Sequence, residues 1–194
     1  MYQRLPSWVL GFHGTDEETV QKAVTDPSFR LAIPKNDYDW LGNGIYFWEN
    51  DPVRAMEFTK ERMQWKGIKD KTPAVVGAVI DLGLCLNLFD QPALKELAVA
   101  YEVFASDMET LDVDLPENKG NSEDRTMRFL DCAVIEHLHR VRDEIGLPKY
   151  QTVRSGFHEG KEAYPGSGFR AKNHIQIAVR DHACIKGFFL PRAS

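Results

Sequence analysis

The sequence has little cysteine, no long apolar run and no surplus of positive charge. Its three cysteines, Cys85, Cys132 and Cys184, are an odd number without metal-ligand spacing, which argues against a disulfide framework or a zinc site. No stretch approaches the roughly 20 apolar residues that cross a membrane. The apolar run at 8–12 is too short for a signal peptide. We therefore expect a soluble, cytoplasmic chain with no metal and no membrane partner.

Positive charge is scarce over most of the chain and gathers in its last quarter. The 194 residues carry a formal charge of -5, which argues against a protein that coats nucleic acid through a surplus of lysine and arginine. Residues 149–194 nevertheless hold 8 basic and 3 acidic side chains, whereas residues 1–148 hold 16 and 26. A basic segment on an acidic body indicates an anionic ligand. A chain of this length suits one domain with its own core.

Short apolar runs and helical patterns follow one another in an order that predicts an α+β fold. We expect strands at 8–12, 44–48, 74–82, 152–157, 175–179 and 184–190. Helices are expected at about 16–24, 52–65, 91–106 and 125–145, the first capped by Thr15 or Asp16 and the second opened by Pro52. The stretch 13–15 is interpreted as a turn, the acidic stretch 109–124 as a mobile loop, and the last two strands as a pair.

Two glycine-bearing stretches suit either local structure or a ligand. His13-Gly14-Thr15 fits a turn with a structural histidine as well as a binding loop. In the stretch 41–47 (LGNGIYF), two glycines let the backbone pass close to a ligand, and Tyr46 can stack on a flat ring. A hairpin turn with a core tyrosine explains the same residues. This is not a dinucleotide-binding glycine fingerprint, because no third glycine follows and a strand comes next instead of a helix.

The stretch 172–179 near the C-terminus predicts a strand with one polar face. Side chains alternate along a strand, so Ile175, Ile177 and Val179 share the core face. His174 and Gln176 then share the opposite face. Two neutral polar groups side by side either meet water or line a cleft.

Taken in order, the three stretches resemble an ADP-ribosyltransferase of the poly(ADP-ribose) polymerase and diphtheria-toxin branch, which has a His–Tyr–Glu triad. Residues 8–58 and 150–190 carry the likeness; 90–145 has no counterpart and is interpreted as a helical insertion in a single domain, 1–194. The chain is also similar to small bacterial proteins ending in a His-Ile-Gln-Ile-x-Val strand, several of them toxins of toxin–antitoxin or phage-defence systems. The resemblance implies a split antiparallel β-sheet with flanking helices, NAD as substrate and, for a toxin, an antitoxin partner.

The resemblance also implies a role for each residue of the motifs. His13 would bind a ribose hydroxyl of NAD, the backbone of Gly14 would hold the nicotinamide carboxamide, and Thr15 follows at the same turn. Tyr46 would stack on the nicotinamide ring. Gly44, in the glycine loop, would give the cofactor close backbone approach.

The chain departs from the triad at its third position. That position falls on Gln176, or on His174 if the register is shifted, and glutamine cannot take a proton. Another carboxylate is then needed as general base, and Glu159, in the loop before the final strands, is the candidate. A solvated loop acid is the other interpretation of Glu159. Arg54 takes the helix position where relatives place a nicotinamide-binding serine, so its guanidinium faces either the cofactor phosphates or solvent.

The expected activity is mono-ADP-ribosyl transfer from NAD to a macromolecule, RNA, DNA or protein. An NAD glycohydrolase, an inactive NAD or ADP-ribose binding module and, more remotely, an RNA 2′-phosphotransferase are the alternatives. Basic side chains around the final strands suit a phosphate-tracking patch as well as a solvated surface; they are Arg154, Lys161, Arg170, Lys172, Arg180 and Lys186. Phe157, Tyr164 and Phe169 are interleaved with them and suit base stacking or a core.

Overall fold

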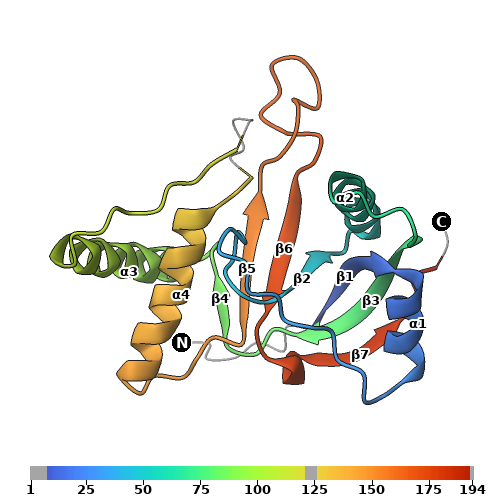
Figure 1. The fold of residues 1–194 in the computed structure, drawn as a ribbon, viewed down its shortest axis with the longest axis horizontal. Coiled ribbons are helices and arrows are strands. Elements are labelled where there is room, and N and C mark those ends of the chain that lie inside the picture. The colour runs from blue at the N-terminus through green and yellow to red at the C-terminus, as the bar shows by residue number, and fades with distance from the viewer. Residues whose placement is uncertain (1–7, 121–125, 193–194) are drawn as a thin grey trace.

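The computed structural model describes residues 8–120 and 126–192 (Figure 1). Seven strands are present: β1 (Trp8–Asp16), β2 (Ile45–Glu49), β3 (Pro73–Asp81), β4 (Cys85–Asn87), β5 (Thr152–Phe157), β6 (His174–Val179) and β7 (Ile185–Phe189). Four helices accompany them: α1 (Glu17–Thr25), α2 (Pro52–Trp65), α3 (Gln91–Thr110) and α4 (Phe129–Glu144). A short 3-10 turn, η1 (His182–Cys184), precedes β7. Over the described residues, no helix has the length and apolar character to cross a membrane.

The strands form one sheet in the order β4-β5-β6-β2-β1-β3-β7. Every pair is antiparallel except β4 with β5. The join between β1 and β2 is narrow, because only Gly11↔Glu49 and Phe12↔Trp48 are paired there, whereas β1 pairs β3 from Trp8 to Asp16. The sheet therefore consists of two parts that separate beyond Phe12. The predicted α+β class is confirmed.

Two expectations about the strands are wrong. The stretch His13 to Thr15 is not a turn but the last part of β1, because β3 supplies a partner for each of these residues. The final strands do not pair with each other either. β6 lies between β5 and β2, while β7 lies at the far edge beside β3. The three-residue β4 was not expected, since so short an apolar run carries no periodicity.

The helices begin where local capping dictates. The Asp16 side chain accepts a hydrogen bond from Thr19 N at 2.9 Å and caps α1. Asp51 does the same for α2, accepting from Arg54 N at 2.8 Å, and Pro52 takes the first helical position as predicted. α3 runs to Thr110, so the expected loop starts later than 109, and its residues 121–124 lie outside the described ones. α4 starts at 129, because Lys119 and Met127 form a β-bridge that keeps the preceding chain extended.

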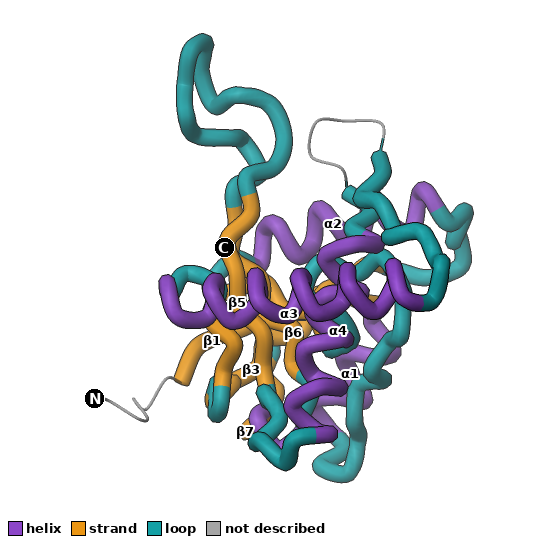
Figure 2. Tube along the Cα trace, turned by 90° about the vertical axis from the view of Figure 1, so that its left-hand side faces the viewer, coloured by secondary structure: helices purple, strands orange, loops and turns teal. Residues whose placement is uncertain are grey.

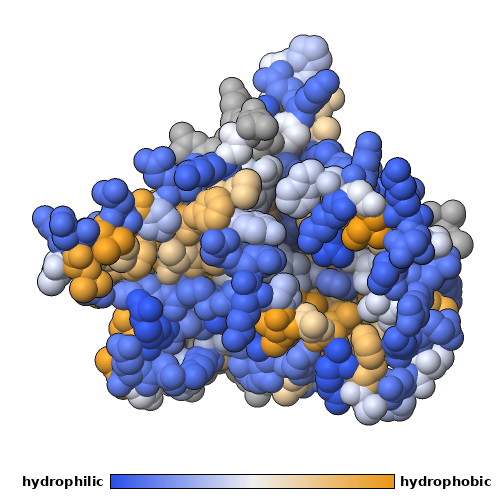
Figure 3. Space-filling model, in the orientation of Figure 1, coloured by the Kyte–Doolittle hydropathy of each residue, from blue (hydrophilic) through white to orange (hydrophobic). Residues whose placement is uncertain are grey.

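The helices divide the two faces of the sheet between them (Figures 1 and 2). On one face, Phe47, Ile80 and Ile177 form the main core, and α1 packs against Val76. On the other face, α3 and α4 cover the β4–β6 part, while Ala55 of α2 packs on the β1–β2 side. Figure 3 shows apolar surface gathered over α3, whose exposed apolar side chains are Leu94, Val99, Tyr101 and Val103.

A hairpin extension, residues 158–173, connects β5 to β6 and stands clear of the sheet (Figures 1 and 2). Ala163 N donates to Phe169 O at 2.9 Å, and Ala171 N donates to Lys161 O at 2.8 Å, so its two sides are tied together. Tyr164 and Phe169 are 59% and 66% exposed at its far end. Neither aromatic belongs to the core, which leaves both open to a partner.

Candidate functional site

His13 lies where β1 separates from β2, and it bridges the two strands. Its Nδ1 is 2.8 Å from the carbonyl oxygen of Tyr46. Because a carbonyl only accepts, Nδ1 carries the proton and Nε2 is left as an acceptor. Burial lowers the pKa of His13 and nearby Arg62 lowers it further, although the Tyr46 hydrogen bond opposes them. The imidazole is therefore neutral at pH 7 and suited to accept a hydrogen bond from a hydroxyl.

The side chains of His13 and Tyr46 lie on different faces of β2. The His13 ring is 5.6 Å from that of Phe47, which points into the main core. The Tyr46 ring packs on the opposite face, on the cluster beneath α3 and α4. A ligand that met both would have to lie along the edge of β1 that β2 leaves unpaired. Backbone polar groups alternate along a strand, and Asn50 N donates to Leu10 O on this edge. The backbone N–H and C=O of Gly14, four residues beyond Leu10, therefore face the same edge.

Gly14 lets α2 approach β1 very closely. A Cβ placed on Gly14 would lie 1.8 Å from Thr59 Oγ1 and 2.6 Å from the carbonyl oxygen of Ala55. Neighbouring Thr15 is buried on the far side of the strand. The position thus needs glycine for packing, whatever it binds.

The glycine loop 41–44 is held by its own chain. A Cβ on Gly42, whose φ is +73°, would meet Glu136, and one on Gly44 would lie 3.0 Å from Ala178 Cβ. Arg180 binds both oxygens of the Glu136 carboxylate and also donates to Asn43 O at 2.8 Å. These contacts fill the space that the glycines leave. The glycines therefore allow close packing against α4 and β6, and the predicted close approach to a ligand stays a prediction.

The Tyr46 hydroxyl completes this arrangement. It accepts from Leu41 N at 2.7 Å and donates to Gly42 O at 2.8 Å. Burial raises the pKa of Tyr46 well above its ordinary value, so the phenol stays neutral. Burial alone would also raise the pKa of Glu136, but its bonds to Arg180 leave that pKa below the ordinary value. The loop beside Tyr46 is therefore held by hydrogen bonds with Tyr46, Glu136 and Arg180, and of these three side chains only Glu136 and Arg180 are charged.

Arg54, Glu159 and His174 form a second cluster, between α2 and the base of the hairpin extension. Arg54 Nη2 donates to both carboxylate oxygens of Glu159, at 3.1 and 3.2 Å. His174 Nδ1 donates to Lys172 O at 2.7 Å and lies 3.7 Å from the Glu159 carboxylate. Burial lowers the pKa of His174, so its ring is neutral and its proximity to Glu159 is not an ion pair. Glu159 is not a solvated loop acid.

Several buried nitrogen atoms around this cluster have no hydrogen-bond partner among the described residues. They are Trp48 Nε1, Arg54 Nε and Nη1, and His174 Nε2. Buried polar atoms are nearly always hydrogen-bonded, so four such nitrogens in one cluster favour a site that receives a ligand. Gln176 is 9% exposed, shares the polar face of β6 with His174, and pairs with Trp48 across the strands. The polar face is thus buried rather than solvated.

The sequence-predicted residues therefore fall into two groups. His13, Gly14 and Tyr46 meet at the separation of β1 and β2, and Arg54, Glu159 and His174 meet at the hairpin base. No hydrogen bond or ion pair between described residues joins the groups. α2 touches both, since it contacts Gly14 through Ala55 and carries Arg54.

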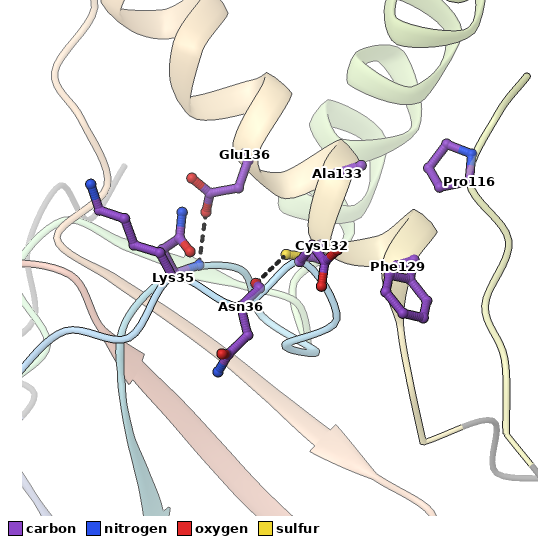
Figure 4. A pocket seen from close by; sticks show the side chains of 9 residues that line it. Lys35, Asn36, Pro116, Phe129, Cys132, Ala133 and Glu136 are labelled. Atoms are coloured by element: carbon purple, nitrogen blue, oxygen red, sulfur yellow. Dashed lines mark hydrogen bonds between the residues drawn. The ribbon is translucent and has the colours of Figure 1, made fainter. Parts of the chain in front are cut away.

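Two pockets are present on the helical side of the sheet. One, of about 400 Å³, is lined by Asn36, Asn43, Cys132 and Glu136 among others (Figure 4). The other, of about 440 Å³, lies between α3, α4 and β5 and reaches Ser155 and Phe157. Neither is lined by any of the nine predicted site residues. We place the candidate site at the polar clusters, because both pockets have mainly apolar linings and lack the unpartnered nitrogens.

No protein-family model, curated protein or solved structure matches this chain. The assignment of the site therefore depends on its own chemistry.

Sequence reasoning missed three contributors to the site, namely Trp48, Arg62 and the Glu136–Arg180 clamp. Trp48 was accessible to it, because position 48 follows Tyr46 by two in a strand and shares its face. Arg62 was accessible in part, since it lies on the same expected helix as Arg54, about two turns further along. The clamp could not be predicted, because Glu136 of α4 and Arg180, which follows β6, are 44 positions apart in the sequence.

The cysteines are structural. Cys132 and Cys184 are each 3% exposed, and burial raises the pKa of both thiols to about 11. They are therefore protonated and unreactive at neutral pH. Over residues 8–120 and 126–192, no three His, Cys, Asp or Glu side chains lie together in a way that could hold a metal ion.

Acid should destabilise the fold through its buried histidines. Burial lowers the pKa of four imidazoles, those of His13, His137, His139 and His174. Below about pH 6.5 these histidines bind protons in the unfolded chain but not in the folded chain. Their contribution to the free energy of unfolding is therefore fully present above that pH and is lost as the pH falls. Urea denaturation from pH 7.5 to 5 should show a slope steeper than one proton gives, about 1.4 kcal/mol per pH unit.

The histidine origin of this slope can be separated from that of the carboxylates. Asp16, Glu136 and Asp181 have lowered pKa values, so their contribution is lost only at lower pH, below about 4.5. Replacing His137 and His139 together with asparagine should flatten the slope between pH 6.5 and 5. An unchanged slope would contradict the prediction.

Proposed function

We propose that this chain is a mono-ADP-ribosyltransferase that uses NAD and modifies a macromolecule. The observation that carries the proposal is the set of buried, unpartnered nitrogens where β2, β6 and α2 meet. NAD presents a pyrophosphate, two riboses and a carboxamide, which need both donors and acceptors. The unpartnered atoms supply both, because Trp48 and Arg54 donate and His174 Nε2 accepts.

The two groups of site residues would bind different parts of NAD. His13 Nε2 would accept from a ribose hydroxyl, and the Gly14 backbone would hold the carboxamide on the open edge of β1. Tyr46 would contact the nicotinamide ring from the other face. Arg54 would bind the pyrophosphate, since a guanidinium forms paired hydrogen bonds to phosphate oxygens.

Transfer breaks the bond between ribose C1′ and the nicotinamide nitrogen, and the bonding electrons leave with nicotinamide. Positive charge then develops on the ribose, as in glycoside hydrolysis. A nucleophilic atom of the acceptor forms the new bond to C1′ and loses its proton to a base. Gln176 would hold a ribose hydroxyl, and Glu159 is the candidate base, provided that its carboxylate first leaves Arg54. His174 would accept a second hydroxyl hydrogen through Nε2.

Nicotinamide release from NAD tests the proposal directly. The protein is incubated with NAD alone, with cell extract, and with nuclease-treated extract, and free nicotinamide is quantified by chromatography. Release that requires extract supports transfer, and its loss after nuclease treatment identifies a nucleic-acid acceptor. Equal release without extract indicates an NAD glycohydrolase. If NAD binds but no nicotinamide is released under any condition, the protein is a binding module and both enzyme functions are rejected.

The tip of the hairpin extension should affect transfer but not cofactor use. Tyr164 and Phe169 are exposed there, beyond the ion pairs that hold the hairpin base. Replacing both with alanine should lower ADP-ribose incorporation into extract by about tenfold, since stacking on an aromatic contributes roughly 1–3 kcal/mol. NAD binding, measured by calorimetry, should not change. Undiminished incorporation would show that the acceptor is held elsewhere.

A further inference from the structure

Arg54 is an almost completely buried cation whose nearest anion comes from a distant part of the chain. Its side chain is 5% exposed, and Nη2 binds the Glu159 carboxylate. The two carboxylates on its own helix are farther away, with Nη1 at 4.0 Å from Glu57 and 3.6 Å from Glu61. Nε and Nη1 donate to no described residue. Nε and Nη1 therefore retain hydrogen-bonding capacity that Glu159 does not use.

A buried arginine needs an anion, because it cannot lose its proton and desolvation of its charge is costly. In this chain the anion lies on the hairpin extension and not on a strand or a helix. Glu159 is the second residue after β5, followed by Gly160 with a φ of +87°. The position of the carboxylate therefore depends on where the hairpin base lies.

A second ion pair fixes the same hairpin to the same helix. Lys172 Nζ lies 2.7 Å from Glu61, and the two side chains are 36% and 48% exposed. Lys172 N also donates to Glu159 O at 2.9 Å, so the two sides of the hairpin base are joined. The hairpin is thus held on α2 by one buried pair and one exposed pair. An exposed pair contributes little, whereas breaking a buried pair leaves an uncompensated charge, so the Arg54–Glu159 contact is the stronger attachment.

We propose that Glu159 is an internal ligand of an anion site built on Arg54, and that a pyrophosphate-bearing ligand displaces it. The identity of that ligand as NAD or ADP-ribose rests on the proposed function. A carboxylate and a phosphate present the same pair of oxygens to a guanidinium. A pyrophosphate additionally reaches the Nε and Nη1 donors that Glu159 leaves without a partner.

Displacement of Glu159 by the phosphate sets the order in which cofactor and acceptor bind. Without ligand, Glu159 holds the hairpin base on α2 and its carboxylate is occupied by Arg54. When a phosphate replaces it, the hairpin loses its stronger attachment and the carboxylate becomes available to accept a proton. Cofactor binding thereby precedes and enables acceptor binding.

Removing the internal ligand should strengthen binding of the external one. Glu159→Gln keeps the shape of the side chain but removes its charge, so ADP-ribose no longer has to displace a carboxylate. Calorimetry should show tighter ADP-ribose binding, by about tenfold or more, because the competent state is no longer a minor one. Inorganic pyrophosphate should gain in the same way. Adenosine, which has no phosphate, should bind both proteins alike.

A matched control separates competition from a general gain in positive charge. Glu61→Gln removes the same charge close to Arg54 and also breaks the Lys172 pair, yet it leaves Glu159 on Arg54. Its affinity for ADP-ribose should change by less than about twofold. Adding Arg54→Met to Glu159→Gln should abolish the gain, because the anion site itself is then lost. Circular dichroism verifies that each variant is folded.

The outcomes distinguish this inference from the proposed function. If Glu159→Gln binds ADP-ribose and pyrophosphate no better than the wild type, or if Glu61→Gln gains equally, the internal-ligand inference is overturned. Nicotinamide release by the wild type would survive that result. Conversely, a gain specific to Glu159→Gln without nicotinamide release by any variant supports the anion site and rejects the transferase.

Discussion

Replacing Gly14 with alanine should destabilise the protein by at least about 3 kcal/mol and should prevent folding if the wild type is only marginally stable. The added Cβ would lie 1.8 Å from Thr59 Oγ1 and 2.6 Å from the Ala55 carbonyl oxygen. Thr59 is completely buried and its hydroxyl donates to Ala55 O at 2.8 Å, so it cannot rotate away without leaving a polar group unpaired. The helix α2 would have to lift from β1. Urea denaturation measures the loss.

Two further variants test the steric origin of this effect. Gly187, in β7, has no atom within 4 Å of an added Cβ, so Gly187→Ala should change stability by less than about 0.5 kcal/mol. Thr59→Ala in the Gly14→Ala background removes the closest contact but not the backbone one, so it should restore stability only in part. A Gly14→Ala protein as stable as the wild type would show that α2 packs differently.

Replacing His13 with alanine should lower nicotinamide release by at least about 100-fold, the effect of removing one group that stabilises charge in a transition state. The neutral Nε2 is the acceptor placed beside the open edge of β1, and no described neighbour replaces it. The same substitution removes the hydrogen bond to Tyr46 O. A moderate loss of stability, about 1–3 kcal/mol, should accompany it, because that carbonyl is left without its partner.

The stability loss must be separated from the loss of activity. Release is therefore measured at a temperature at which circular dichroism shows the variant to be folded, and at saturating NAD. His182→Ala is the matched control, because that histidine lies in η1, ahead of the edge strand β7, and it should release nicotinamide as the wild type does. Normal release by a folded His13→Ala protein would refute the assigned role of His13.

The two parts of the candidate site differ in how visible they were in the sequence. Tyr46 was expected on a strand and lies on β2, whereas His13 and Gly14 were expected in a turn and lie within β1. The continuation of β1 past Gly14 depends on β3, which lies about 60 positions further on. The number of strands at the C-terminus was predicted correctly, but their partners were not. Pairing is a property of the whole sheet, whereas strand propensity is local.

The Arg54–Glu159 contact illustrates what local reasoning cannot reach. Both residues could be singled out from their positions relative to the motifs, one as a phosphate ligand and the other as a base. Their mutual hydrogen bonds, across 105 positions, were not expected. The contact changes the role proposed for both residues, because the Glu159 carboxylate binds Arg54 where an external anion would bind.

The sequence by itself determined most of the elements and the first residues of α1 and α2. Asp16 and Asp51 cap the helices that follow them, and the alternation from 174 to 179 places His174 and Gln176 on one face. These features depend on residues within a few positions of each other, where backbone geometry is fixed by local hydrogen bonds and side-chain direction.

Only the tertiary structure decided which surfaces these elements share. It brought α2 onto Gly14, the Glu136–Arg180 clamp onto the glycine loop, and the hairpin base onto Arg54. Positive charge is scarce over most of the chain, so the position of each cation matters more than their number. We expect the one buried guanidinium of Arg54 to bind an anion more strongly than the exposed basic side chains of the last quarter. The reason is that burial, more than the number of charges, sets the strength of an electrostatic contact.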